Sequence, residues 1–193
     1  MSCIRGYNRR VPSLLLFTAV IFCLYSCASA RVRENRLFAW VTDSARYFLL
    51  PPEYLETPMD NLQFISASYG RQNFHVIVLV RADETGLDMT MINEMGAGMG
   101  ELIWRNGAIS FSSSVFPRSV QPEYIVADFQ LCFYDAKALG RVLGDAGLLF
   151  EETDAGRRIY NGNRLIIEIT KTPNTVNFIN HLRGYSYTLE GEF

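Results

Sequence analysis

The stretch NFHVIVLVRADETGLDMTMINE, residues 73–94, decides the fold class of this chain. Its first half is a run of β-branched and aliphatic residues that ends at Arg81, and its second half alternates apolar with polar side chains from Leu87 onward. The turn residues Glu84-Thr85-Gly86 separate the two halves. Short runs of this kind, divided by turn residues, are typical of antiparallel strands. The stretch therefore predicts two neighbouring antiparallel strands, 73–81 and 87–94.

The same pattern extends in both directions along the chain. Asn106-Gly107 and Asn161-Gly162-Asn163 are strong hairpin turns, and each lies between two further short apolar runs. Two segments between the turns instead place apolar residues at helical spacing and predict short helices at 123–133 and 136–143. Strands are predicted at 63–69, 73–81, 87–94, 101–105, 108–113, 148–152, 157–160, 164–171, 175–180 and 185–189.

Several of these strands have one apolar face and one polar face. The apolar faces consist of Leu87, Met89 and Met91; Leu165, Ile167 and Ile169; Val176 and Phe178; and Tyr185, Tyr187 and Leu189. A sheet of this type must cover its apolar face, and two short helices are poor cover for about ten strands. The expected fold is mainly β (α+β): a curved antiparallel sheet or incomplete β-barrel of about ten strands. The two helices are inserted near the middle as a lid or plug, and the interior is an apolar hollow or a filled core.

The N-terminus has the features of an export signal. Arg5, Arg9 and Arg10 precede an apolar run at 13–24, which is too short for the ~20 apolar residues that a spanning helix prefers. The run ends in Leu-Tyr-Ser-Cys27, which resembles the bacterial lipobox, where the cysteine is acylated and the peptide is cleaved in front of it. The resemblance implies that Cys27 is the lipidation site and that this lipid tethers the protein to a membrane.

Two alternatives to a lipoprotein signal remain open: an uncleaved anchor, or an ordinary secretory signal cut near Ala28 or Ala30. In each case the remainder leaves the cytoplasm. The domain organisation predicted from the sequence is a signal peptide at 1–26, a lipidated N-terminus with a tether and an irregular or short helical segment at 27–60, and a single β domain at 61–193.

Composition excludes several classes of protein. The chain has 193 residues and a formal net charge of -2, and loss of residues 1–26 with their three arginines leaves 15 basic against 20 acidic residues. Such a surface is not built to hold nucleic-acid phosphates or anionic lipid headgroups, so no nucleic-acid partner is expected. Cys132 is the one cysteine that remains beyond Cys27, and a single thiol cannot form an internal disulfide. We interpret Cys132 as a buried apolar residue.

The chain resembles bacterial outer-membrane lipoproteins of unknown function that are often encoded beside aryl-polyene or fatty-acid-type synthesis genes. The resemblance is carried by the signal through Cys27 and by short motifs at 49–52, 125–131 and 157–160, together with a closing pattern of Val176, Phe178, Asn180, Tyr185, Tyr187 and Leu189. The order of strands and helices is also similar to that of the lipoprotein-localisation carriers LolA and LolB, whose incomplete barrel receives acyl chains. This resemblance implies an acyl-chain or other lipophilic ligand at the outer membrane, facing the periplasm. An aspartate directly after the acylated cysteine resembles an inner-membrane retention signal. Ala28 follows Cys27 here instead, which favours the outer membrane.

The sequence does not assemble a catalytic constellation. His75 lies inside an apolar strand, and His181 has no companion at the spacing of metal ligands. The loop at 96–100 has the wrong glycine spacing for a dinucleotide fingerprint and is followed by a strand. We therefore expect no catalytic residue, no metal site and no cofactor.

Two hypotheses of function follow. In the first, the protein is an envelope lipoprotein that binds or carries a lipid or other lipophilic molecule in a hollow, driven by apolar burial. The residues expected to line that hollow are Met89, Met91, Trp104, Phe111, Phe129, Phe133, Leu165, Ile167 and Phe178. In the second, the interior is packed shut, and the protein is a non-catalytic structural or assembly lipoprotein that binds an envelope protein through an exposed strand edge or loop.

Overall fold

A computed structural model describes residues 36–114, 116 and 120–193. The predicted signal peptide, Cys27 and the first part of the tether lie outside these residues. Two α-helices and one short 3-10 helix interrupt the strands: α2 (Pro122–Phe133), α3 (Ala136–Asp145) and η1 (Pro52–Tyr54). The strands are β1 (Phe38–Trp40), β2 (Arg46–Phe48), β3 (Met59–Tyr69), β4 (Gln72–Asp83), β5 (Gly86–Ile92), β6 (Gly98–Arg105), β7 (Ala108–Ser113), β8 (Leu149–Thr153), β9 (Gly156–Asn161), β10 (Arg164–Thr172), β11 (Thr175–Asn180) and β12 (Tyr185–Glu190).

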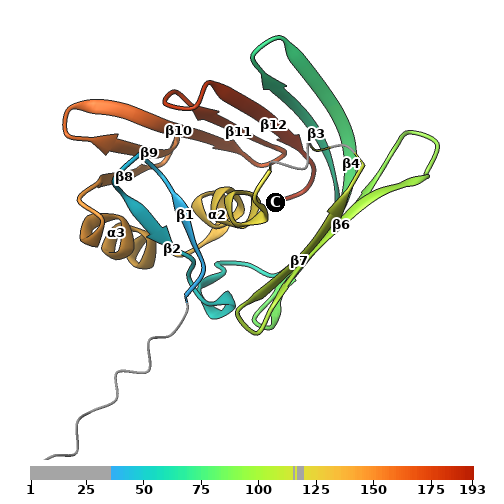
Figure 1. The fold of residues 1–193 in the computed structure, drawn as a ribbon, viewed down its shortest axis with the longest axis horizontal. Coiled ribbons are helices and arrows are strands. Elements are labelled where there is room, and N and C mark those ends of the chain that lie inside the picture. The colour runs from blue at the N-terminus through green and yellow to red at the C-terminus, as the bar shows by residue number, and fades with distance from the viewer. Residues whose placement is uncertain (1–35, 115, 117–119) are drawn as a thin grey trace, which may run out of the picture. The chain divides into compact units, whose positions relative to one another are not determined.

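Ten of the strands form one curved antiparallel sheet in the order β7-β6-β5-β4-β3-β12-β11-β10-β9-β8 (Figure 1). The order consists of two five-stranded meanders, β3 to β7 and β8 to β12, which are joined in the middle by the pairing of β3 with β12. The first and last strands of the β domain are therefore neighbours, whereas β7 and β8 lie at opposite edges. The sheet stays open, because β7 and β8 each pair with a strand on one side.

The position of the helices follows from this topology. Because β7 and β8 lie at opposite edges, the chain that joins them has to cross the sheet, and it crosses on the concave side as α2 and α3 (Figure 1). Pro122 occupies the first turn of α2, where its missing N–H costs nothing. The Asp135 carboxylate accepts a hydrogen bond from the Ala138 N–H at 2.8 Å and caps α3.

The predicted fold class is confirmed: each of the ten predicted strands and both predicted helices has its counterpart in the structure. The Asn106-Gly107 turn has φ of 52° and 72° at its two residues, the conformation that favours this pair of residues in two-residue hairpins. Leu87, Met89 and Met91 are all buried, as their alternation predicts. The regular part of the fold can thus be read from alternation and turn chemistry.

Residues 36–60, predicted as tether and irregular or short helical segment, contain a hairpin that the sequence pattern did not reveal. Strands β1 and β2 pair in the register Phe38↔Phe48, Ala39↔Tyr47 and Trp40↔Arg46. Arg36–Phe193 forms one compact unit, of which this hairpin is a part. The hairpin contributes Tyr47, which is 0% exposed, to the core.

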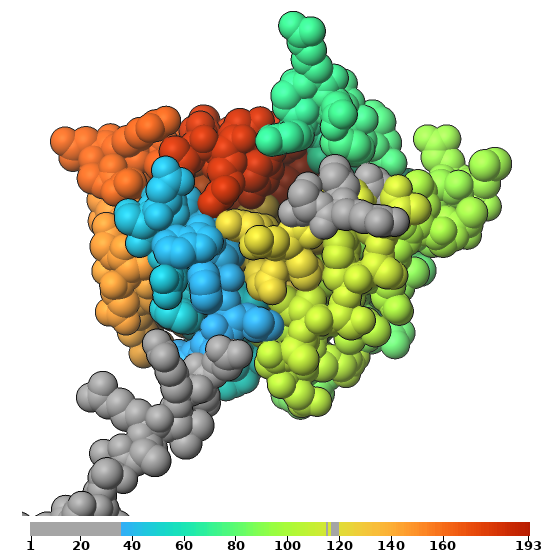
Figure 2. Space-filling view, viewed as in Figure 1, coloured from blue at the N-terminus to red at the C-terminus, as the bar shows by residue number. Residues whose placement is uncertain are grey.

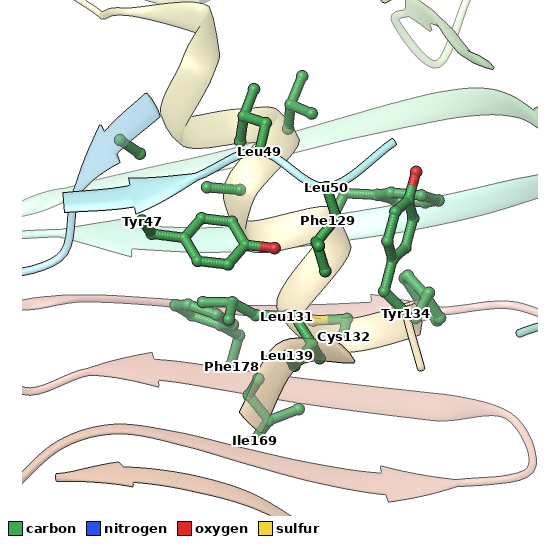
Figure 3. Packing of buried hydrophobic residues seen from close by; sticks show 14 of the residues in the cluster. Tyr47, Leu49, Leu50, Phe129, Leu131, Cys132, Tyr134, Leu139, Ile169 and Phe178 are labelled. Carbon is green, nitrogen blue, oxygen red and sulfur yellow. The ribbon is translucent and has the colours of Figure 1, made fainter. Parts of the chain in front are cut away.

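The core lies between the concave face of the sheet and the segments that cover it. Tyr47, Leu49 and Leu50 lie on one side of α2, while Phe178 and Ile169 of the sheet lie on the other (Figure 3). On one face of the molecule the hairpin and part of α2 reach the surface between the two ends of the sheet (Figure 2). Within residues 36–114, 116 and 120–193, no helix is long and apolar enough to span a membrane.

One strand corrects the predicted pattern of faces. Strand β10 was expected to present Leu165, Ile167 and Ile169 on a single face, but its pairing with β9 shifts between Leu165 and Ile167. Ile166 is the extra residue, so Ile167 pairs with Ile159, whereas Leu165 pairs with Tyr160. A bulge of one residue reverses the side-chain alternation beyond it. Leu165 is consequently half-exposed and absent from the residues that pack on the core.

Candidate functional site

The candidate site is the contact between the curved sheet and an inner layer, which we define as residues 38–50 and α2. Across the described part of the chain, no backbone–backbone hydrogen bond joins the inner layer to the ten-stranded sheet. The two parts are held together by apolar contacts and by a small set of side-chain hydrogen bonds. The inner layer covers the concave face without belonging to its hydrogen-bond ladder.

The residues predicted to line a hollow do converge on the concave face. Seven of the nine are buried in the core, namely Met89, Met91, Trp104, Phe129, Phe133, Ile167 and Phe178. Phe111 is half-buried and packs against them, and Leu165 is the exception described above. The inner layer fills the space in front of the sheet, and the Phe129 and Phe133 rings are 5.0 Å apart. These residues form a filled core in this structure.

A pocket of about 440 Å³ opens elsewhere, beside η1 and the turn between β4 and β5. It contains none of the residues predicted to line a hollow. Its lining is partly acidic and consists of Pro52, Glu53, Leu55, Pro58, Asp83, Glu84 and Thr85. Asp83 is already bonded to the N–H and the hydroxyl of Thr85.

A buried glutamine joins the two parts of the inner layer. Gln130 of α2 is 0% exposed, and its Oε1 accepts hydrogen bonds from the Tyr47 hydroxyl at 2.7 Å and the Leu50 N–H at 2.9 Å. Its Nε2 donates to the Leu50 carbonyl at 2.8 Å. One amide thus satisfies both backbone groups of Leu50 and holds the hairpin against α2. Burial raises the pKa of the Tyr47 hydroxyl well above its usual value, so this hydroxyl remains a donor.

A buried arginine joins the sheet to the end of α2. The Arg157 side chain, on β9, is 1% exposed and donates from Nη1 to the Leu131 carbonyl at 2.9 Å. Its Nη2 and Nε form ion pairs with Glu56 at 2.9 Å and with Glu152 at 2.8 Å. These two carboxylates are 43% and 41% exposed, so the guanidinium is buried while its counter-charges reach water. Arg157 is among the largest fully buried side chains of the described residues.

A second arginine binds the inner layer at the other end of α2. Arg183 lies in the turn between β11 and β12, and its Nη2 donates to the Trp40 carbonyl of β1 at 2.7 Å. Its guanidinium also lies over the Tyr124 ring at 4.8 Å from the ring centroid. Arg157 and Arg183 therefore hold both ends of α2, and Arg183 also holds the hairpin.

Titratable groups line the middle of the same interface. Tyr185 on β12 donates to the Asp128 carboxylate at 2.7 Å, and the Cys132 thiol lies 3.9 Å from the Tyr187 hydroxyl. Burial, opposed by Tyr185 and Arg183, raises the pKa of Asp128 to about 7. Burial, together with the nearby Asp128 carboxylate, raises the pKa of Cys132 to about 12. At neutral pH the thiol is protonated and serves as a packing residue.

The Asp128 carboxyl should make the protein less stable as pH rises from about 4 to about 7. In this window the unfolded chain releases the Asp128 proton while the folded chain retains it, so each step upward favours unfolding until the folded group also ionises. We expect Asp128→Asn to remove this part of the pH dependence, which amounts to a few kcal/mol at most. Urea unfolding of both proteins at pH 5 and pH 8 measures the difference. An equal change with pH in both proteins contradicts the assignment.

The two histidines lie apart from this interface. His75 is exposed on β4, where its Nδ1 is 3.1 Å from the Ser66 hydroxyl. His181 follows β11, and its Nε2 is 3.8 Å from Glu168. Neither contact includes Cys132, which is fully buried.

Sequence reasoning missed the polar residues that hold the interface. The sequence pattern places Arg157 in the short motif at 157–160 and places Gln130 and Asp128 in a predicted helix, but it assigns none of them a side-chain partner. The signal that identifies Gln130 is its position between apolar residues on the buried side of α2, where a polar side chain needs a partner.

A family model described as "Protein of unknown function (DUF3261)" matches residues 60–191. The matched part is more than half of the chain and includes all but the first residue of the ten-stranded sheet, with both helices. No curated protein matches the chain.

Proposed function

We propose that this chain, which belongs to the DUF3261 family of proteins of unknown function, is an envelope lipoprotein that binds a lipid or another lipophilic molecule. The ligand would lie against the concave face of the sheet, in the place that part of the inner layer occupies in this structure. Its class is set by the apolar residues of that face, such as Met91, Trp104 and Phe178. The binding energy would come from apolar burial at ~25 cal/mol per Å².

One observation carries the proposal: among the described residues, no backbone–backbone hydrogen bond joins the inner layer to the sheet whose apolar face it covers. Moving α2 or the hairpin away breaks no hydrogen bond between the strands of the sheet. The sheet therefore keeps its shape while its concave face is uncovered. An acyl chain would then replace the apolar contacts that the inner layer gives up. The order of strands and helices resembles that expected for LolA and LolB, whose incomplete barrel receives acyl chains, and this resemblance supports the same ligand class.

The anchor and the location are part of the proposal. The lipobox-like segment supports acylation of Cys27, and Ala28 after it supports the outer membrane, with the domain facing the periplasm. A tethered domain meets lipids at the membrane surface, where a free protein would have to find them by diffusion. Multiple acyl chains on one residue make such a tether stable.

Photolabelling tests the ligand class. We expect a diazirine-bearing palmitic acid, added to the full chain reconstituted in phospholipid vesicles, to label peptides that contain Phe129 or Phe178. An excess of unlabelled palmitic acid should suppress this labelling about tenfold or more, because the site saturates. Phe178→Trp should also reduce it by filling the inner face, and Ile179→Trp, which changes a 37% exposed neighbour, is the matched control. The proposal would be refuted if labelling were confined to residues on the outer face of the sheet and its yield rose linearly with the concentration of the probe.

A second candidate function is a non-catalytic assembly lipoprotein that binds an envelope protein. Edge strand β7 favours it, because Ala108–Ser113 carries no charged side chain and pairs with β6 on one side. Native proteins usually protect such edges with charges, so an uncharged edge suits the addition of a partner strand. Absence of interior labelling in the experiment above would favour this candidate.

A further inference from the structure

The outward face of the β1–β2 hairpin carries a cluster of rings and one guanidinium. Alternation along the two strands directs Ala39 and Tyr47 into the core and turns the other residues outward. We call the outward residues Phe38, Trp40, Arg46 and Phe48 the aromatic–arginine surface. Phe48 is 40% exposed, and Phe38 and Trp40 are partly exposed. None of the three rings belongs to the core or packs against it.

The cluster is ordered by contacts among its own members. The Arg46 guanidinium lies 4.6 Å from the Trp40 ring centroid and 5.0 Å from that of Phe38. The Phe38 ring makes an edge contact with Trp40 at 5.7 Å and a tilted contact with Phe48 at 5.8 Å. Three large rings left outside the core are costly in water, and contiguous apolar surface of this kind marks an interaction site. Figure 2 shows that the hairpin lies at the surface of the molecule.

A second guanidinium lies close to the aromatic–arginine surface. Arg183 donates to the Trp40 carbonyl and lies over the Tyr124 ring, so it repeats the arginine-on-ring arrangement beside the hairpin. Tryptophan and arginine together are typical of a membrane interface, where rings enter the headgroup level and guanidinium groups meet phosphates. Both residue types are present here on the surface of one hairpin.

The position of the hairpin in the sequence favours a membrane as the partner of this surface. Phe38 is eleven residues after Cys27, and eleven extended residues span at most about 40 Å. The intervening stretch RVRENR, residues 31–36, has three arginines against one glutamate, although the exported chain as a whole has an excess of acid. This local positive charge complements anionic headgroups.

We propose that the aromatic–arginine surface lies against the phospholipid surface to which the chain is tethered, with Trp40 and Phe48 at headgroup level. This inference rests on the anchoring part of the proposed function and adds a fixed orientation to it. The concave face and the inner layer would then open close to the membrane. A lipophilic molecule would have a short path from the bilayer to α2.

Tryptophan quenching tests the contact. The chain has two tryptophans, and Trp104 is 3% exposed in the core, so Trp40 is the one that bromine in a lipid can reach. The full chain is reconstituted in vesicles of zwitterionic and anionic phospholipids with acyl chains brominated near the headgroup. We expect the emission to be quenched relative to vesicles without bromine, and Trp40→Phe should abolish the quenching. Arg46→Gln should weaken the contact about fivefold, and Arg71→Gln, at the exposed β3–β4 turn, should leave it unchanged.

Flotation of the same vesicles separates the anchor from the contact. If Cys27 carries the lipid, the wild type floats and Cys27→Ser does not. Wild-type protein that floats but shows no quenching overturns the contact and leaves the surface to a protein partner, while the anchor stands. Quenching in protein that floats equally well after Cys27→Ser refutes the anchor and leaves the contact intact. Protein that neither floats nor is quenched overturns both.

Discussion

Arg157→Met should lower the free energy of unfolding by about 3 kcal/mol. The substitution keeps a long apolar stem in the same place and removes the guanidinium. It leaves the Leu131 carbonyl without its donor at the end of α2, and it leaves Glu56 and Glu152 without their shared cation. The carbonyl is the costly loss, because it is enclosed by the interface.

The two carboxylates moderate the expected loss. Breaking a buried ion pair costs ~3–5 kcal/mol when the remaining charge is trapped. Here Glu56 and Glu152 are 43% and 41% exposed and can regain water, so the lower end of that range applies. Arg157→Lys keeps the charge but has no planar fork to reach three partners, and should lose part of the same stability.

Urea unfolding of the full chain, followed by tryptophan fluorescence, measures the effect. Arg158→Met is the matched control, since Arg158 is the next residue, is half-exposed and pairs with Glu168 on the outer face. We expect no measurable loss for the control. Hydrogen exchange at the α2 amides should increase for Arg157→Met before the strand amides change. Equal stabilities of the two variants would show that the Arg157 guanidinium does not hold the inner layer.

The contrast between Arg157 and Arg158 explains how far the sequence could predict the site. Alternation predicts that one of these two adjacent arginines faces inward. It does not say which one, because a charged side chain at either position would suit the outer face of the sheet. The choice is made by register: Arg157 pairs with Ile169 on one side and with Glu152 on the other. This register depends on the bulge at Ile166. The residues around Ile166 are all apolar, so the sequence does not show where the bulge lies.

The sheet itself was predictable because its signals are local. Several strands have their own alternation, and turns such as Asn106-Gly107 have their own backbone preference. The β1–β2 hairpin was not predictable in the same way. Its strands are three residues each, and Arg46 and Asp43 interrupt the apolar pattern. Its stability comes from long-range contacts with α2, which no local pattern contains.

The sequence leaves both a filled core and an open hollow possible, and the same long-range contacts decide between them. Residues 38–50 supply the volume that two helices alone lack, and they occupy the concave face beside α2. Residues 1–59 lie outside the family match, so β1 and β2 are contributed by the part of this chain that precedes it. How firmly that hairpin is attached to α2 therefore determines how well the concave face stays covered.

Gln130→Leu should detach the hairpin and lower the free energy of unfolding by about 3 kcal/mol or more. Leucine is close to glutamine in volume, so packing changes little, but three buried groups lose their partner: the Tyr47 hydroxyl and the N–H and carbonyl of Leu50. A buried polar group left unpaired costs ~1–3 kcal/mol, and these losses add incompletely because the groups are neighbours.

Two variants calibrate this result. Tyr47→Phe removes one of the three hydrogen bonds and leaves both Leu50 contacts, so it should cost about 1 kcal/mol. Gln72→Leu makes the same chemical change at an exposed position of β4 and should be nearly neutral. In the Gln130→Leu protein, the hairpin amides, above all that of Leu50, should exchange faster than those of the sheet. If Gln130→Leu is no more destabilising than Tyr47→Phe, the amide does not connect the hairpin to α2, and apolar packing alone keeps the concave face covered.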